Sequence, residues 1–561
     1  MLYAHIGLDW KSCCHQPPPP GAVSPATVRS ALSVGDADDG NLLVQGDNLL
    51  ALKALLPYYA GKVKCIYIDP PYNTGEEGWV YNDNVRSIDL QQWIAQVVGK
   101  ESIDLSRHDK WLCMMYPRLS LLRQFLREDG VIYVSIDENE IGNLRLLMDE
   151  IFGEINSLGS LVWKRRSSSA MRGMPLSIDH EYILVYGLDA RKSRLYGLAK
   201  GIESYPYEDE RGHYASTDLT VGMGKDARPG QFYPITNPNT GVLYQPNPER
   251  VWRFFPDTMQ RVIEAKLIIW PDEAVGSRME RPRYKTYYNP DSEKPIPVSS
   301  WIESSGINDK DIAEEEAEYD VTILQSGMTQ EGGKLLQQII GSKVFAYPKP
   351  LSLVRALIRA TTRRDDLVLD SFAGTGTTGH AVLDLNNEDD NARKFVLIEM
   401  EDDICRDITH ERLRRIINGY NYMRSKGGIA TVDGMGGGFR FCRLGEPLFD
   451  EHGIIRSEVK YPELAAHVYF TETGSPILQP ANEKNPLLGI HNGVAVYLLF
   501  NGVLGDKSPK GGNVLTNDML RGLPSHDGPK VIYGDGSRLS AERLRREGIV
   551  FKQVPYGIKV S

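Results

Sequence analysis

The sequence is poor in several features that would place it in one of the large protein classes. It has only six cysteines among 561 residues, without the spacing of metal ligands, so we expect reduced thiols and no metal site. No run of about 18 apolar residues occurs, which argues against a membrane span. The N-terminus lacks a basic segment followed by an apolar one, the pattern of a secretory signal. These absences predict a cytoplasmic globular protein.

Positive charge is scarce as well. The chain has 64 Lys and Arg against 74 Asp and Glu, a net charge of −10, whereas proteins that bind nucleic acid through phosphates are usually basic. Any such contact must therefore come from local clusters. We expect phosphate contacts from one cluster of Lys164, Arg165, Arg166 and Arg172, and from a second of Arg278, Arg281, Arg283 and Lys285 interleaved with tyrosines. For the first cluster, a merely solvated loop is an equal alternative.

A phosphate-binding loop of the form G-x-x-x-x-G-K-[S/T] is also missing. The tetrapeptide Asp272–Val275 imitates a helicase box, but without that loop nothing holds a nucleoside triphosphate. Any ATPase or nuclease activity would therefore belong to another polypeptide.

The most informative motif present is Asp69-Pro70-Pro71-Tyr72, which follows the apolar run Val63–Ile68. An exocyclic amine of a nucleobase is a poor nucleophile, and it needs acceptors for its N–H groups. The Asp69 carboxylate can accept one and the Pro70 carbonyl, in a stiff proline frame, the other. Tyr72 offers a ring on which an extruded base can stack. The alternative is an ordinary Pro-rich turn that ends a strand.

A second motif lies far along the chain. Leu367–Thr378 is typical of a buried strand, a glycine turn and a helix start, a geometry that lets backbone approach a ligand closely. The next predicted strand, Lys394–Ile398, ends at Glu399, which can bind ribose hydroxyls. Since Glu399 also follows Gly379 by 20 residues, this segment alone does not separate a methyltransferase from a dinucleotide-dependent dehydrogenase.

Together, the two motifs resemble the amino-methyltransferases that modify nucleic-acid bases with S-adenosylmethionine. Tyr72 precedes Phe372 by 300 residues, and this order is similar to the circularly permuted β group of that family. Four further segments resemble the modification subunit of type III restriction systems: residues 41–56, 68–75, 111–119 and 147–153.

The resemblance implies roles for individual residues. The catalytic loop would be Asp69, Pro70, Pro71 and Tyr72. The S-adenosylmethionine site would comprise Asp47, Lys349, Asp370, Phe372, Ala373, Gly374, Thr375, Gly376 and Glu399. His180-Glu181 matches a segment near the flipped base, with a structural role equally open. Asp rather than Ser at position 69 favours adenine N6 over cytosine N4. The implied partners are double-stranded DNA, a second copy of the chain, and a restriction subunit with helicase and nuclease activity.

The expected fold class is α/β, a doubly wound Rossmann-like methyltransferase sheet with an inserted target-recognition domain and a small C-terminal α/β domain. We predict an N-terminal arm over 1–40 and the catalytic half of the sheet over 41–190, which includes a helix over Leu119–Arg127. The recognition domain would follow over 191–334, the cofactor half over 335–433 and the C-terminal domain over 434–561.

Three alternatives to a DNA adenine methyltransferase remain at this point. A methylase acting on cytosine N4 or on RNA shares all the motifs. A catalytically silent recognition subunit would bind the cofactor and orient a complex, but intact Asp69 and Tyr72 argue against it. A dehydrogenase would leave the Asp-Pro-Pro-Tyr loop without a role.

Overall fold

The structure is a computed structural model of the whole chain. It describes residues 26–28, 32–35, 40–74, 107–167, 176–195, 205–273, 279–288, 297–305, 321–424, 427–445, 448, 455–456, 459–475, 477, 481–482, 485–500 and 512–554. The chain divides into two compact units. Unit 1 comprises Met1–Arg194, Ser300–Ser304 and Gln325–Ser561, and unit 2 comprises Leu195–Ser299 and Ser305–Leu324.

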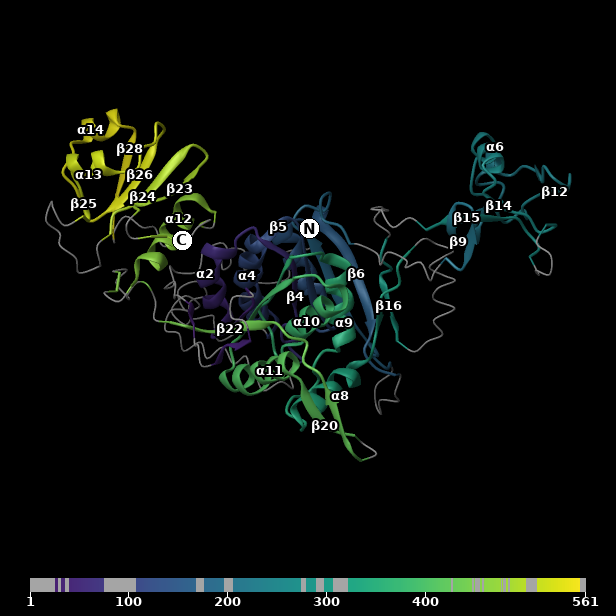
Figure 1. Ribbon diagram of the computed structural model, residues 1–561, viewed down its shortest axis with the longest axis horizontal. Coiled ribbons are helices and arrows are strands. Elements are labelled where there is room, and N and C mark those ends of the chain that lie inside the picture. The colour runs from purple at the N-terminus through teal and green to yellow at the C-terminus, as the bar shows by residue number, and fades with distance from the viewer. Residues whose placement is uncertain are drawn as a thin grey trace. The chain divides into compact units, whose positions relative to one another are not determined.

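Unit 1 is built on a mixed sheet of twelve strands, whose middle lies around β4 in Figure 1. The order along the sheet is β1-β22-β3-β19-β18-β4-β5-β7-β6-β16-β17, and β2 pairs with β22. Neighbours from β22 to β5 are parallel, whereas β7 is antiparallel to both β5 and β6. The strands are β1 (Ala26–Val28), β2 (Val34–Gly35), β3 (Leu42–Gln45), β4 (Val63–Ile68), β5 (Leu126–Ile136), β6 (Ser157–Lys164), β7 (His180–Gly187), β16 (Trp301–Ser304), β17 (Gln325–Ser326), β18 (Leu367–Asp370), β19 (Lys394–Glu399) and β22 (Gly438–Leu444).

Helices cover both faces of this sheet. Alternate residues of β5 contact helices on opposite faces. On one face, Ile132 and Val134 join the core formed with α2, α4 and α5. On the other face, the hydroxyl of Tyr133 contacts that of Thr361 on α9 at 2.6 Å. The central strands are buried on both sides, as their continuous apolar sequences require. This confirms the predicted doubly wound α/β class. The helices are α2 (Asn48–Tyr59), α4 (Arg107–Phe125), α5 (Ile141–Phe152), α8 (Thr329–Ile340), α9 (Leu351–Thr361), α10 (Thr377–Asp389) and α11 (Glu411–Asn418).

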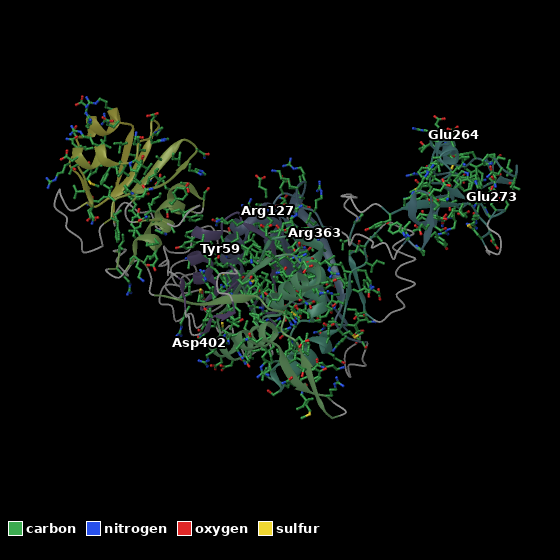
Figure 2. The ribbon with its side chains drawn as sticks, viewed as in Figure 1. Tyr59, Arg127, Glu264, Glu273, Arg363 and Asp402 are labelled. Atoms are coloured by element: carbon green, nitrogen blue, oxygen red, sulfur yellow. The ribbon has the colours of Figure 1, made fainter. Side chains whose placement is uncertain are left out.

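One predicted element boundary needs correction. The sequence pattern suggested a helix over Leu119–Arg127, but α4 runs over Arg107–Phe125 and Leu126 already begins β5. Arg127, labelled in Figure 2, lies in the strand. It pairs with Asp366, just before β18, at 3.1 Å. Among the described residues, no helix is long and apolar enough to cross a membrane.

The C-terminal part of unit 1 carries a second, four-stranded sheet in the order β23-β24-β26-β28. The helix α12 supplies Leu464 and Val468 to a core beneath it, together with Val496 and Tyr533. The remaining elements of this part are β20 (Tyr420–Met423), β21 (Ile429–Val432), α12 (Tyr461–Thr473), β23 (Leu487–His491), β24 (Val494–Leu498), β25 (Val514–Leu515), α13 (Asn517–Gly522), β26 (Lys530–Gly534), β27 (Gly536–Ser537), α14 (Ala541–Arg546) and β28 (Ile549–Gln553).

Unit 2 is a small, mostly β structure with its own core around Trp252 and Trp270. Its main sheet has the order β14-β15-β9-β8, and two further two-stranded sheets pair β10 with β13 and β11 with β12. Its elements are β8 (Tyr207–Asp209), β9 (Gly212–Asp218), β10 (Thr220–Val221), β11 (Ile235–Thr236), β12 (Leu243–Tyr244), β13 (Val251–Trp252), α6 (Pro256–Glu264), β14 (Ile268–Ile269) and β15 (Arg283–Tyr287).

Candidate active site

The two motifs meet at one edge of the sheet. β4 and β18 are parallel neighbours, with Ile66 opposite Leu369, so Asp69, which follows β4, and Asp370, which ends β18, lie at the carboxyl ends of adjacent strands. From β18 the chain moves outward to β19, and from β4 it moves outward to β5 on the other side. A change of direction of this kind opens a crevice at the carboxyl ends of the strands, where open α/β sheets bind ligands.

The catalytic loop, Asp69 to Tyr72, is fixed by buried neighbours. The indole Nε1 of Trp111 donates to the Pro71 carbonyl at 2.7 Å, and Trp111 itself is fully buried in the core. Asn73 ends the loop in the left-handed region at φ 59°, and its amide donates to the buried Glu140. No hydrogen bond from the described residues reaches the Pro70 carbonyl. That oxygen therefore remains able to accept a proton donor from a ligand.

The Asp69 carboxylate belongs to a group of four charged residues. The Lys349 ammonium lies 2.9 Å from Asp69 Oδ1 and 3.3 Å from Glu181 Oε2. It also donates to the hydroxyl of Tyr72 at 2.7 Å, and that hydroxyl donates to Glu181 at 3.0 Å. Arg165 Nη1 pairs with the other oxygen of Glu181 at 3.2 Å. The group therefore holds two carboxylates and two cations, which balance in charge.

Burial and ion pairing compete in this group. Burial raises the pKa of Asp69, and the Lys349 ammonium partly opposes that shift. Burial acts to lower the pKa of Lys349, but the attraction of Asp69 and Glu181 outweighs it, so the pKa lies above its usual value. Lys349 therefore stays a cation at neutral pH, and its charge favours an ionised, proton-accepting Asp69.

Several hydrogen bonds hold the glycine loop after β18 in place. The carboxylate of Asp370 accepts from the backbone N–H of Phe372 at 2.9 Å and from the hydroxyl of Thr378 at 2.5 Å. Gly374 and Gly376 have φ of 50° and 74°, a conformation that favours glycine. Gly376 directly precedes α10, so the loop delivers the N-terminus of that helix to the crevice. The backbone N–H of Ala373 donates to Ile398 of β19.

Glu399 closes the other side of this loop. Its carboxylate accepts from the N–H of Gly374 at 2.7 Å and from the N–H of Glu401 at 3.0 Å. Burial raises the pKa of Glu399 to about 7, and burial likewise raises the pKa of Asp370 to about 7. These two buried carboxylates suit a ligand that brings a positive charge or hydroxyl donors.

The residues at these strand ends fit a cofactor of the S-adenosylmethionine type. Ser371 Oγ, which directly follows Asp370, is buried and has no hydrogen-bond partner among the described residues. An unsatisfied hydroxyl, two carboxylates and a helix N-terminus together offer partners for ribose hydroxyls, an ammonium group and a carboxylate.

The start of α2, at Asp47 and Asn48, lies beside the glycine loop. Asp47 caps α2 by accepting from the N–H of Leu50 at 2.9 Å, and its other oxygen lies 3.7 Å from Arg118. The next residue, Asn48, donates to the Ser371 carbonyl at 3.2 Å. Asp47 thus lies one residue from a direct contact with the loop.

The sequence reasoning did not single out Arg412, which supports the glycine loop from behind. Its guanidinium is completely buried and donates to the Thr375 carbonyl at 3.3 Å and to the hydroxyls of Thr375 and Thr377 at 3.0 and 2.8 Å. Among the described residues it has no acidic partner within ion-pair distance, although burial lowers its pKa only to about 10. A signal existed in the sequence, because Arg412 shares the buried face of α11 with Leu413, Ile416 and Ile417.

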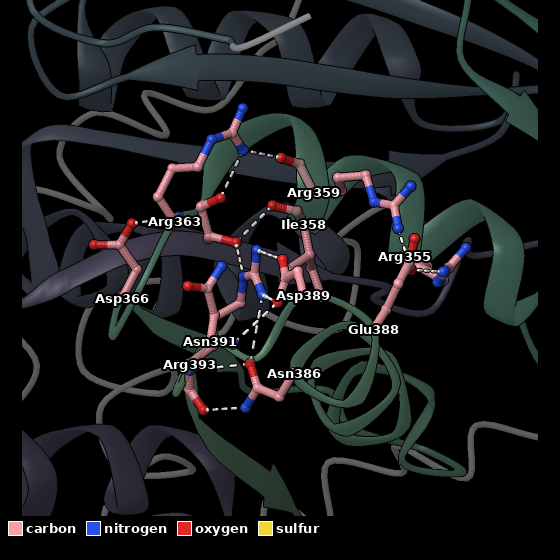
Figure 3. A network of polar contacts seen from close by, with 11 residues as sticks. Arg355, Ile358, Arg359, Arg363, Asp366, Asn386, Glu388, Asp389, Asn391 and Arg393 are labelled. Atoms are coloured by element: carbon pink, nitrogen blue, oxygen red, sulfur yellow. Dashed lines mark hydrogen bonds and ion pairs between the residues drawn. The ribbon is translucent and has the colours of Figure 1, made fainter. Parts of the chain in front are cut away.

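A network of arginines and acids ties α9 to α10 (Figure 3). Glu388 on α10 forms ion pairs with Arg355 and Arg359 on α9. Below them Arg393, almost fully buried, bonds to Asp389 and to the hydroxyl of Thr362. The network joins the helix that carries the glycine loop to the helix that follows Lys349.

The expected cofactor residue Lys349 has a mixed position. Its carbonyl accepts from the hydroxyl of Thr377 at the start of α10, but its ammonium points to the catalytic loop. The main chain of Lys349 thus contacts the start of α10, beside the glycine loop, whereas its ammonium contacts the catalytic loop.

The predicted phosphate-binding residues fall in both units. In unit 1, Lys164 ends β6, and the partly exposed Arg165 and Arg166 pair with Glu181 and Asp179. In unit 2, Lys285 pairs with Asp209 and Arg283 bonds to Ser216, while Arg281 is exposed. Arg172 and Arg278 lie outside the described residues.

Comparison with known proteins gives consistent relatives. The family described as DNA methylase (N6_N4_Mtase) matches residues 63–410. The Mod subunit of the type III restriction-modification enzyme StyLTI from Salmonella typhimurium is 34% identical over 376 residues, 64% of this chain and 52% of that protein. The EcoP15I Mod subunit of Escherichia coli is 31% identical over 68% of this chain and 61% of that protein. The type II methyltransferase M.KpnI of Klebsiella pneumoniae is 31% identical over 66% of this chain and 82% of that protein. The matches therefore span little more than half the length of the Mod subunits.

Proposed function

The chain belongs to the DNA methylase family that it matches over residues 63–410, and from this premise we propose that it transfers a methyl group from S-adenosylmethionine to adenine N6 in DNA. The observation that carries the proposal is the parallel pairing of β4 with β18. It brings an amine-accepting loop and a glycine loop to one crevice although 300 residues separate them.

The residues on the catalytic side act on the target amine. Asp69 accepts one N–H of the amine and the Pro70 carbonyl accepts the other, which draws the nitrogen lone pair out of the ring. Both oxygens also stabilise the positive charge that grows on the nitrogen as it reacts. The ring of Tyr72 holds the extruded base by stacking.

The residues on the cofactor side hold and orient the donor. Asp370 and Glu399, with the helix N-terminus at Gly376, would bind its charged and hydroxyl groups. When bound, S-adenosylmethionine supplies an electrophilic methyl group, so the chain needs no nucleophile of its own. Alignment of the amine with that methyl group across the crevice is the contribution of the fold.

The substrate in this proposal is double-stranded DNA, from which the target base is extruded. Lys164, Arg165 and Arg166, beside the catalytic loop, and Arg172 would contact phosphates, and Arg281, Arg283 and Lys285 of unit 2 would take part in recognition. The relatives are named as Mod subunits of type III restriction-modification enzymes, which supports a restriction subunit as partner. We place the reaction in the cytoplasm as part of the same proposal. A homodimer follows only from the family resemblance.

The test is methylation in cells that lack their own DNA methylases. Expression of the full chain should place N6-methyladenine at one recurring sequence, detected by methylome sequencing and by mass spectrometry of the nucleosides. The Asp69→Ala variant should lose this mark while it still binds S-adenosylmethionine in calorimetry.

Two results would contradict the proposal. Unchanged methylation by Asp69→Ala would remove Asp69 from the reaction, and tighter binding of NAD than of S-adenosylmethionine would assign the glycine loop to another cofactor. N4-methylcytosine instead of N6-methyladenine would favour the second candidate, which the N6/N4 scope of the family supports.

A further inference from the structure

The ammonium of Lys349 lies where the target amine is expected to bind. It lies 2.9 Å from Asp69 Oδ1, the oxygen assigned to accept from the amine. It also donates to the Tyr72 hydroxyl at 2.7 Å and lies 4.7 Å from the centroid of that ring, at its hydroxyl end rather than over its face. One nitrogen thus occupies the acceptor position of the catalytic loop and ties down the ring beside it.

We propose that Lys349 is a placeholder for the target amine: its ammonium fills the acceptor position in the substrate-free protein and moves to Glu181 when the base arrives. The inference rests on the proposed function and deepens it, because it names the residue that the base displaces. Lys349 is a positioning residue in this scheme, since it leaves the reacting atoms before methyl transfer.

Charge gives the physical reason for a placeholder. An uncompensated carboxylate at this depth is unfavourable, and the ammonium neutralises it while the site is empty. An amine that reacts with a methyl donor becomes a cation at the same point in space. A site that holds an ammonium at rest is therefore already shaped and charged for the reacting amine rather than for the neutral one.

The surroundings provide a second position for the displaced ammonium. Glu181 Oε2 is only 3.3 Å from the Lys349 nitrogen, so a short movement exchanges one carboxylate for the other. The flexible four-carbon stem of lysine permits this movement, whereas a rigid, forked guanidinium would not follow as easily. Arg165 on the far oxygen of Glu181 keeps that carboxylate ionised and in place.

The opposite reading is that Lys349 stays on Asp69 throughout and orients it. The two readings predict opposite effects when lysine is removed. A displaced lysine competes with the amine, so its removal strengthens the contribution of the amine to binding. A lysine that stays assists the amine, so its removal weakens that contribution.

The experiment compares two duplexes that carry the sequence found by methylome sequencing. One has adenine at the methylated position, and the other has purine, which lacks the exocyclic amine. Affinities are measured by fluorescence anisotropy with S-adenosylhomocysteine, which cannot react. The readout is the preference for adenine over purine.

We expect Lys349→Met to increase this preference roughly tenfold, the worth of a hydrogen bond to a charged acceptor that no longer faces competition. Glu181→Gln should reduce the preference, because the ammonium then loses its alternative position. Lys334→Met, at an exposed site on α8, is the matched control and should leave the preference unchanged. Glu181→Gln also keeps the test decisive if Lys349→Met does not fold.

An unchanged or smaller preference in Lys349→Met, or a larger one in Glu181→Gln, would overturn the placeholder. Failure of the proposed function looks different, because the wild-type chain would then leave no methylated adenine at which to place the purine.

Discussion

The catalytic loop and the glycine loop meet at the same sheet edge, but the carboxylates in and beside them have different kinds of partners. Asp370 and Glu399 accept only from backbone N–H groups and one hydroxyl, and no cation lies within ion-pair distance of them in the described part of the chain. Asp69 and Glu181 instead share the two cations Lys349 and Arg165. Backbone donors are fixed by the fold, whereas ion pairs can exchange partners.

The difference matches what each side must do. A cofactor that binds in one orientation benefits from donors that do not move, since a preorganised site needs little rearrangement. In the proposed function, a base that arrives from a duplex needs a site whose carboxylate is neutralised by a cation before the base binds and becomes accessible once the base is there.

On the catalytic side, Tyr72→Ala should reduce methylation on the order of a hundredfold, because it removes a stacking interaction worth roughly 1–3 kcal/mol and the partner of Lys349. Tyr72→Phe keeps the ring and should lose less than tenfold. Initial rates with radiolabelled cofactor measure both. Equal losses in the two variants would mean that the hydroxyl, rather than the ring, carries the role of Tyr72.

Behind the glycine loop, Arg412→Met should lower the free energy of unfolding by about 2 kcal/mol, since the hydroxyls of Thr375 and Thr377 lose their buried donor. Arg414→Met is the matched control on the same helix. Its salt bridge to Glu411 is partly exposed, and its loss should cost less than about 1 kcal/mol. Chemical denaturation measures both, and a control as destabilised as Arg412→Met would refute the distinction.

Within the loop, Gly376→Ala should cost about 1–2 kcal/mol of stability, because φ is 74° and the added Cβ would meet Thr409 Cγ2 at 2.9 Å. Cofactor affinity should fall with it. Gly333→Ala, inside α8 with open space around its Cβ position, should stabilise the protein by a few tenths to 1 kcal/mol. Thermal unfolding with and without cofactor gives both numbers, and a neutral Gly376→Ala would contradict the strained geometry.

The two buried carboxylates should also make stability depend on pH. Burial raises the pKa of Asp370 and of Glu399 to about 7, so between about pH 4 and pH 7 the folded protein binds more protons than the unfolded chain. The free energy of unfolding should therefore fall as pH rises through this window. Asp370→Asn should reduce that slope by up to about 1.4 kcal/mol per pH unit. Denaturation at pH 5, 6 and 7 measures the slope, with the exposed Asp365→Asn as control, and an unreduced slope would count against Asp370.

Much of the sheet was accessible from sequence because its strands are continuous apolar runs that end at chemically distinctive residues. Val63–Ile68 before Asp69 and Leu367–Asp370 before the glycines are examples. The pairing of β4 with β18 makes these two strand ends neighbours. The assigned roles of the site residues, and the domain boundaries drawn from composition, stay predictions.

The contacts of Lys349 and Arg412 were not accessible in the same way. Lys349 lies in a Pro-Lys-Pro segment, and nothing in that pattern tells which of two nearby loops its long side chain reaches. Its partner Glu181 comes from β7, whose position beside β5 depends on the pairing of the complete sheet. Periodicity places Arg412 on a buried face, but only the packed structure supplies its three oxygen acceptors.

Unit 2 is inserted into unit 1 in two segments, which begin after Arg194 and after Ser304. The polypeptide departs after Arg194, returns for β16, departs again after Ser304 and returns for β17, and both strands lie at the margin farthest from β22. A segment inserted at the end of a sheet can be lengthened, shortened or exchanged for another while the strands β4 and β18, which precede the two loops, keep their register. In the proposed function, such a layout lets the recognised DNA sequence change while the strands that carry the two loops stay the same.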